Sequence, residues 1–248
     1  MEHGTKKFKI KTSDNLFDRF LFNLLRLFKS KHNILLPDKQ PLPRRAIYVS
    51  NHSGAEGPLS IRMYLPVRMM IWGAHQMLGN YKERTNYLYH VFYRQKLRFG
   101  KVRSFILTYL FGIISRIAYS AGGVLPVHYD TAGLRRTMQY SLECLHKDIS
   151  IVIFPEDASE GYRSQLVGVF RGFLVLSKLY FKQTGVDLPI YPVYCRSETH
   201  TMHVGKPMYY QELKKKYCDD SAILNLFTAA INNLNPENCN TEPSKSVS

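Results

Sequence analysis

Ala46-Ile47-Tyr48-Val49-Ser50-Asn51-His52 and its counterpart Ile151-Val152-Ile153-Phe154-Pro155-Glu156 are the most informative segments of the chain. Each is a short apolar run that stops at polar and turn-forming residues. We expect each run to be a buried strand that carries a reactive side chain to the carboxyl edge of a sheet. A histidine at one strand end and a glutamate at another are the groups needed for proton transfer. The alternative for His52 alone is an imidazole satisfied by nearby backbone groups.

The segments around these two runs alternate between strand and helix patterns. Further strands are predicted over residues 69–72, 124–127 and 190–194. Helices are predicted from Ser13 or Asp14 to about residue 30, over 131–146, and over 170–184, where Gly185 can end the helix. This alternation predicts an α/β fold with a mostly parallel sheet flanked by helices.

The chain of 248 residues is long enough for one sizeable core, and no stretch has the composition of a linker between domains. We expect three parts: a basic, amphipathic segment over 1–36 that associates with a membrane, a domain over 37–234, and a disordered polar tail over 235–248. The four cysteines are widely separated and have no histidine at zinc spacing. They predict free thiols in a reducing compartment and no metal site.

The charge of the chain is strongly basic. Lys and Arg number 34 against 19 Asp and Glu, giving a net charge of +15. Such a surface attracts polyanions, and the segment from Arg94 to Arg103 concentrates the charge beside an apolar stretch. No nucleic-acid recognition motif accompanies it, and the aromatic spacing suits helix packing better than base stacking. We therefore expect an anionic membrane surface as a partner, and no nucleic acid.

Two apolar segments bear on the membrane. In the predicted helix from residue 14 to 30 the polar residues form one narrow stripe, which suits an interfacial helix as well as one packed on the core. No segment reaches the roughly 18 uncharged apolar residues of a spanning helix, and the nearest covers 105–114. The residues before Lys11 are polar and basic, unlike a secretory signal. These patterns predict peripheral or monotopic attachment at the cytoplasmic face of a membrane.

Four blocks in the order of this chain resemble the 1-acylglycerol-3-phosphate acyltransferase (PlsC-like) family, over roughly residues 46–207. Asn51-His52 with Gly54 and Pro58 is similar to the block N-H-x-S-x-x-D-P. The other similar stretches are Gly122-Gly123-Val124-Leu125-Pro126-Val127, Ile153-Phe154-Pro155-Glu156 followed by Phe170-Arg171-Gly172-Phe173, Leu188-Pro189-Ile190-Tyr191-Pro192-Val193, and the closing Val204-Gly205-Lys206-Pro207.

The resemblance implies an O-acyltransferase in which His52 is the general base. It would take the proton of an acceptor hydroxyl that attacks an acyl thioester, carried on coenzyme A or acyl carrier protein. The thioester is already activated, so no bound cofactor, metal or covalent nucleophile is expected. Asn51, Gly123, Pro155 and Glu156 are the substrate-binding candidates that this similarity carries over.

The family aspartate that orients the histidine falls on Gly57. In a serine-protease triad, losing such a carboxylate costs about ten-thousand-fold in rate. Glu56, one position earlier, is the predicted catalytic substitute. The alternatives are another carboxylate, such as Asp157, or a backbone carbonyl that holds the ring.

The phosphate-binding positions also depart from the family pattern. His128 and Ser159 stand where arginines are usual, and Asp157 adds negative charge where a phosphate would lie. Arg163 is the predicted replacement, with Arg135 and Arg136 as alternatives and an exposed loop arginine as the simpler interpretation. The expected acceptor is therefore a lysophospholipid with another headgroup or a related lipid alcohol. The competing interpretation is a catalytically inactive lipid-binding or regulatory protein on the same scaffold.

Overall fold

The structure, a computed structural model, describes residue 8 and residues 10–37, 40–54, 56–156 and 161–236. Its centre is an eight-stranded sheet in the order β1-β7-β6-β2-β5-β3-β4, with β8 paired to β6. The strands are β1 (Asn33–Leu35), β2 (Ile47–Ser50), β3 (Met69–Ala74), β4 (Val124–Val127), β5 (Ser150–Ile153), β6 (Pro189–Arg196), β7 (Thr201–Val204) and β8 (Met208–Tyr209). The predicted strands at β2, β3, β4, β5 and β6 are all present, with ends shifted by at most two residues.

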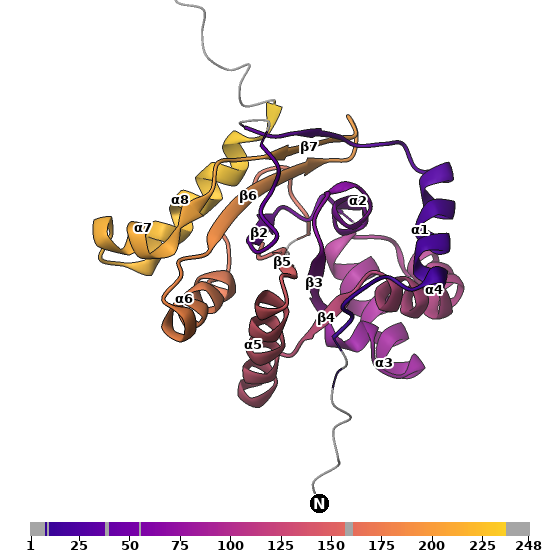
Figure 1. The fold of residues 1–248 in the computed structure, drawn as a ribbon. Helices are drawn as coiled ribbons and strands as arrows, with labels where there is room; N and C mark the ends of the chain where they lie inside the picture. The colour runs from indigo at the N-terminus through magenta and orange to yellow at the C-terminus, as the bar shows by residue number, and fades with distance from the viewer. Residues whose placement is uncertain (1–7, 9, 38–39, 55, 157–160, 237–248) are drawn as a thin grey trace, which may run out of the picture.

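Helices cover both faces of this sheet (Figure 1). They are α1 (Leu16–Phe28), α2 (Glu56–Tyr64), α3 (Tyr81–Asn86), α4 (Lys101–Ala121), α5 (Thr131–His146), α6 (Gly172–Thr184), α7 (Tyr210–Lys216) and α8 (Asp220–Asn233), with a short 3-10 helix η1 (His75–Met77) and a π-helix η2 (Tyr87–Lys96). The strands β2 to β6 pair in parallel where they are neighbours, and only β7 and β8 run antiparallel to β6. The predicted α/β fold with a mostly parallel sheet is confirmed.

The central strands are buried on both faces because the sheet lies between two helix layers. Ile47 and Val49 point into one hydrophobic core, which α5, α6 and α8 complete. Tyr48 and Val152 point into the opposite core, where α2 contributes Ile61. Successive side chains of a strand alternate between faces, so a strand between two layers needs apolar residues at every position. This is why the apolar runs before His52 and Glu156 contain no charged residue until they end.

The N-terminal helix starts one or two residues later than predicted. Asn15, rather than Ser13 or Asp14, is the N-cap: its side chain accepts from the Asp18 N–H at 2.8 Å, and Asp18 accepts from the Asn15 N–H at 2.9 Å. This reciprocal pair is a capping box, which satisfies two backbone donors at the helix start. Helix α5 begins after Asp130 as expected, and Gly185 ends α6 with φ of 71°.

Helix α4 is longer than the predicted apolar stretch at 105–114. It runs for 21 residues and includes Lys101, Arg103 and Arg116, so it is longer than the uncharged stretch on which the sequence-based expectation rested. By length and composition alone this helix could cross a membrane, and 22% of its most apolar window is buried. The buried residues Ser104, Thr108 and Gly112 are polar or small, while most of the large apolar side chains of α4 are exposed.

The two ends of the described chain are tied to the sheet domain. Strand β1 lies within the predicted membrane segment 1–36 yet pairs with β7 at the sheet edge. The Lys11 ammonium donates to the carbonyls of Ser120 and Ala121 at the end of α4. Asn235, the first residue of the predicted disordered tail, is buried, and the tail beyond residue 236 lies outside the described residues.

Candidate active site

His52 and Glu156 meet at the carboxyl edge of the sheet. Strands β2 and β5 are parallel, with Ile47 opposite Ile151 and Val49 opposite Ile153. Continuing this pairing by three residues brings His52 opposite Glu156. The His52 backbone N–H donates to the Glu156 carboxylate at 2.7 Å. The predicted partnership of the two strand ends is therefore present, although the glutamate holds the histidine's backbone and not its ring.

The imidazole of His52 is fixed by the loop that follows it. Ser53 and Gly54 have φ of 43° and 66°, which turns the chain back so that the Gly54 carbonyl faces His52 Nδ1. A carbonyl can only accept, so Nδ1 carries the hydrogen and Nε2 has the free lone pair. The Tyr162 hydroxyl lies 3.3 Å from Nε2 and donates to it. A hydroxyl thus already occupies the position from which a base would remove a proton.

The surroundings of the ring are aromatic. The Tyr162 ring stacks on the imidazole at 4.3 Å between centroids, and the Phe154 ring lies 5.1 Å away. Burial, with a smaller effect of the nearby Lys96 ammonium, lowers the pKa of His52 to about 4, against the Gly54 carbonyl, which raises it. His52 is consequently neutral at physiological pH, the form in which it can accept a proton.

Lys96, which sequence reasoning did not single out, adds a positive charge to the site. It is the last residue of η2, and its ammonium lies 5.6 Å from the centroid of the Tyr162 ring. Burial lowers the Lys96 pKa while Glu156 raises it. Burial raises the pKa of Glu156 to about 7, opposed by the His52 N–H and by Lys96. A cation and a titratable acid therefore share the surroundings of the imidazole.

The predicted catalytic substitute, Glu56, is placed elsewhere. It is the first residue of α2, and its carboxylate forms an ion pair with Lys29, the residue that caps the end of α1. Among the described residues no hydrogen bond joins it to the imidazole. Of the two alternatives to Glu56, a backbone carbonyl, that of Gly54, stands at Nδ1. Asp157, the other candidate carboxylate, and Ser159 lie outside the described residues.

Gly57 explains why the aspartate position cannot be filled in this loop. A Cβ atom built on Gly57 would overlap the carbonyl oxygen of His52 and come within 2.9 Å of its carbonyl carbon. The first turn of α2 packs against the His52 backbone so closely that only glycine fits. A carboxylate at this position would require the loop to move.

Two of the predicted substrate-binding residues, Asn51 and Gly123, have other positions or contacts than a site around His52 would require. Asn51 is buried, and its side-chain amide bonds both the N–H and the C=O of Cys195, at 2.7 and 2.9 Å. This extends the pairing of β2 with β6 by one residue. Gly123 precedes β4, so it lies at the amino end of that strand, whereas His52 lies beyond the carboxyl end of β2. Gly123 therefore lies at the opposite edge of the sheet from His52, and its part in substrate binding stays a prediction.

The other predicted substrate-binding residues lie at or near the carboxyl edge of the sheet. His128 follows β4 and stacks on His75 after β3, with ring centroids 4.2 Å apart. Pro155 is buried, and its carbonyl accepts from the Phe170 N–H at 2.8 Å. Arg163 directly follows Tyr162 and has an exposed side chain.

No protein-family model matches the chain, and no curated protein matches it. Among solved structures the chain is similar to the 1-acyl-sn-glycerophosphate (LPA) acyltransferase PlsC from Thermotoga maritima. The identity is 12% and the TM-score 0.49, over 92% of this chain and 79% of that chain. A likeness this low assigns neither a family nor a function to the chain.

Proposed function

We propose that the protein is an O-acyltransferase that moves a fatty acyl group from an acyl thioester to the hydroxyl of a lysophospholipid or related lipid. The observation that carries the proposal is the state of His52: its Nδ1–H is held by a carbonyl, and its free Nε2 receives a hydroxyl at 3.3 Å. The four sequence blocks that resemble the PlsC-like family support the same chemistry.

In the proposed reaction the acceptor hydroxyl replaces the Tyr162 hydroxyl at His52 Nε2. The imidazole removes its proton as the oxygen attacks the thioester carbonyl carbon. The tetrahedral intermediate collapses, the carbon–sulfur bond breaks, and the departing thiolate takes the proton from His52. The acyl donor is acyl-CoA or acyl-acyl carrier protein, and no bound cofactor takes part in this scheme.

Two groups would assist this step. The Gly54 carbonyl keeps the ring oriented while the imidazolium exists, which replaces one function of the missing carboxylate. Lys96 supplies positive charge beside Glu156, where it can stabilise the oxyanion of the tetrahedral intermediate. Its charge is effective because the site is buried and little water screens it.

Access to a lipid acceptor is proposed through α1 and α4. These helices run side by side on one flank of the molecule (Figure 1), and both carry large exposed apolar side chains. They are Leu16, Phe17, Phe20, Leu27 and Phe28 on α1, and Val102, Phe105, Ile106, Tyr109, Leu110, Ile113 and Ile114 on α4. The Lys29–Glu56 ion pair joins the end of α1 to the helix that follows the His52 loop, so this face adjoins the site. We propose peripheral or monotopic attachment at the cytoplasmic face of a membrane.

The direct test is acyl transfer from labelled acyl-CoA and acyl-acyl carrier protein into a panel of lysophospholipids and lipid alcohols. The proposal expects ester formation with at least one donor–acceptor pair. Tyr162→Phe should retain that activity, because the acceptor displaces the Tyr162 hydroxyl in the reaction. An inactive Tyr162→Phe with native stability would show that this hydroxyl takes part in the chemistry itself.

A second candidate is a lipid-binding or regulatory protein without turnover. It is favoured by the absence of a carboxylate at His52 Nδ1 among the described residues and by Tyr162 filling the position at Nε2. This alternative predicts no ester product from any donor–acceptor pair, with membrane binding intact and unchanged in His52→Ala.

A further inference from the structure

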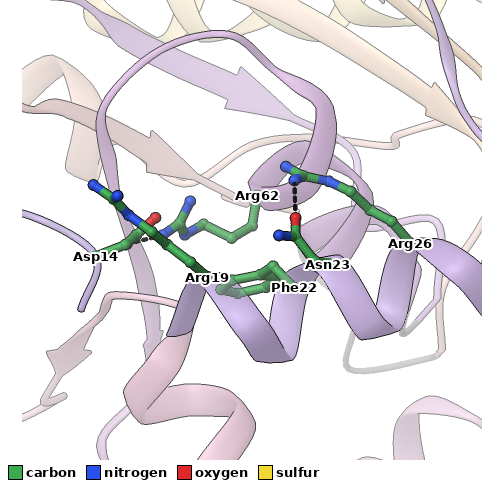
Figure 2. A pocket seen from close by; sticks show the side chains of 6 residues that line it. All are labelled: Asp14, Arg19, Phe22, Asn23, Arg26 and Arg62. Atoms are coloured by element: carbon green, nitrogen blue, oxygen red, sulfur yellow. Dashed lines mark hydrogen bonds and ion pairs between the residues drawn. The ribbon is translucent and has the colours of Figure 1, made fainter. Parts of the chain in front are cut away.

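A pocket of about 260 Å³ lies between α1, with Asp14 just before it, and the end of α2, outside the proposed active site. Figure 2 shows the six side chains that line it: Asp14, Arg19, Phe22, Asn23, Arg26 and Arg62. Three arginines face one aspartate, so the lining carries a net charge of +2 from three positive groups and one negative group. A pocket of this charge selects an anion.

The three arginines differ in how many hydrogen bonds and ion pairs they form within the protein. Arg62 is committed to the fold: it pairs with Asp14, donates to the Gly122 carbonyl at 3.1 Å, and lies over the Phe22 ring at 4.8 Å. Its pairing with Asp14 also neutralises the one acidic group of the lining. Arg26 donates to Asn23 Oδ1 at 3.1 Å and to the Met63 carbonyl at 2.6 Å, while its side chain stays exposed.

Arg19 is exposed, and among the described residues no hydrogen bond or ion pair engages its guanidinium. Arg19 and Arg26 lie on either side of Asn23 along the helix, so their planar guanidinium groups can donate hydrogen bonds to one ligand. Guanidinium groups bind phosphate oxygens through two parallel hydrogen bonds, which a single lysine cannot do.

The position of the pocket on α1 identifies the kind of anion. At about 100° per residue, Arg19, Asn23 and Arg26 form one line along the helix. The buried Phe22 lies on one side of this line, and the exposed apolar residues Leu16 and Leu27 lie on the other. A helix lying in a membrane surface places its apolar face among the acyl chains and its bordering basic residues at the level of the phosphates.

We infer that this pocket binds the phosphate of an anionic phospholipid headgroup and sets the orientation of the protein on the membrane. The inference rests on the membrane attachment proposed above and goes beyond it by naming a site. Arg19 and Arg26 are the residues that contact the phosphate, and Arg62 is the positioning residue that holds the pocket wall. The ligand is a structural lipid, distinct from the acceptor that would reach His52.

The test compares two double variants that remove the same charge. Arg19→Gln with Arg26→Gln empties the pocket of its available donors. Lys178→Gln with Lys182→Gln removes two exposed lysines from α6, on the other side of the molecule. Binding is measured by co-sedimentation with vesicles of pure phosphatidylcholine and of equal parts phosphatidylcholine and phosphatidylglycerol. The pocket variant should lose roughly thirtyfold in affinity for the anionic vesicles, and the control less than about threefold.

Three results would overturn the inference. Equal losses in both double variants would show a general electrostatic attraction and no site. Equal binding of the pocket variant and the wild type would show that the arginines do not contact lipid. Thermal stabilisation by inorganic phosphate that the pocket variant loses, without any change in vesicle binding, would assign the pocket to a soluble anion. Because the binding assay contains no acyl donor, and His52→Ala is measured alongside, failure of this site is distinguishable from failure of the acyl-transfer proposal.

Discussion

His52 is oriented by a backbone carbonyl, which is neutral, rather than by a carboxylate. A neutral partner fixes the tautomer but stabilises the imidazolium less than a charged one does. Burial and the nearby Lys96 ammonium outweigh the effect of this carbonyl and hold the His52 pKa at about 4. The imidazole is therefore unprotonated, and able to act as a base, at any pH above that value. Because its basicity is modest, we expect positioning of the acceptor and the charge of Lys96 to supply more of the rate acceleration.

This arrangement predicts the pH dependence of acyl transfer. The unprotonated imidazole is the active form, so kcat/KM should stay level as pH falls through the ordinary histidine value of 6.5 and decline only as it approaches about 4. Initial rates should be measured in Glu156→Gln as well, because that variant removes a second titration in the same range. A decline centred near 6.5 in both proteins would contradict the environment assigned to His52.

The buried Glu156 predicts a pH-dependent stability. Its pKa is raised from 4.5 to about 7, so between these values the native state binds more protons than the unfolded state, and stability falls as pH rises. Glu156→Gln removes that loss. Its free energy of unfolding relative to wild type should therefore improve between about pH 4.5 and pH 8, by on the order of 2–3 kcal/mol. Urea unfolding at the two pH values measures this, and a difference independent of pH would refute it.

Among the helices and strands, the start of α2 depends on a glycine. Gly57→Ala places a methyl group against the His52 carbonyl, so the helix or the His52 loop must shift. We expect a loss of about 1–3 kcal/mol in the free energy of unfolding. Gly100→Ala is the matched control, because nothing lies within 4 Å of a Cβ there and its φ is negative. Similar losses in the two variants would mean that the close contact at Gly57 does not exist.

Helices α1 and α4 predict a separable effect on membrane binding. Phe20 and Ile113 are 64% and 65% exposed, so replacing either with serine should leave the free energy of unfolding unchanged. If their faces enter a membrane, each replacement should weaken vesicle binding about tenfold or more, from the lost burial of a large apolar side chain. Val186→Ser, at a 52% exposed position beyond α6, controls for surface hydrophobicity and should have no effect. Unchanged binding in all three variants would exclude this face.

Strands and helices whose ends are marked by neighbouring residues in the chain were predictable from the sequence. Strand β4 and helix α5 have the predicted bounds because a glycine pair introduces the strand and Asp130 caps the helix. The extent of α4 was missed because Arg103 and Arg116 interrupt its apolar run, and its outer face is the apolar one.

The parts of the site that were missed depend on contacts between distant segments. Lys96 and Tyr162 could not be found from the sequence, since only the packing of η2 and of the loop after β5 brings them to His52. Glu56 was misplaced because its partner, Lys29, comes from a different helix. Pairings of this kind leave no periodic or local signal in the chain.

For the molecule as a whole, the basic charge and the apolar flank act over different ranges. The net charge of +15 attracts an anionic surface over a distance that salt shortens, whereas apolar burial acts only on contact. Affinity for anionic vesicles should therefore fall steeply with added salt toward a residual value that salt does not change. Affinity for phosphatidylcholine vesicles should hardly respond. Loss of all binding at high salt would assign the attachment to charge alone and remove α1 and α4 from it.

The parallel sheet brings several titratable side chains together at its carboxyl edge. Continuing the strand pairings beyond their ends places His52, Glu156, His75 and His128 at one level, after β2, β5, β3 and β4. Parallel strands make this possible because all four end at the same edge. Of these four residues, His52 is the one proposed as the base of an acyl transfer.

The decisive experiment for His52 is the initial rate of acyl transfer into the best lysolipid acceptor, in wild type, His52→Ala and His146→Ala. His146 is an exposed histidine of α5 and serves as the control. We expect His52→Ala to lose at least about a hundredfold in rate with native stability and vesicle binding, while His146→Ala retains the wild-type rate. Transfer that persists in His52→Ala, or that no wild-type preparation shows with any donor and acceptor, would contradict this role.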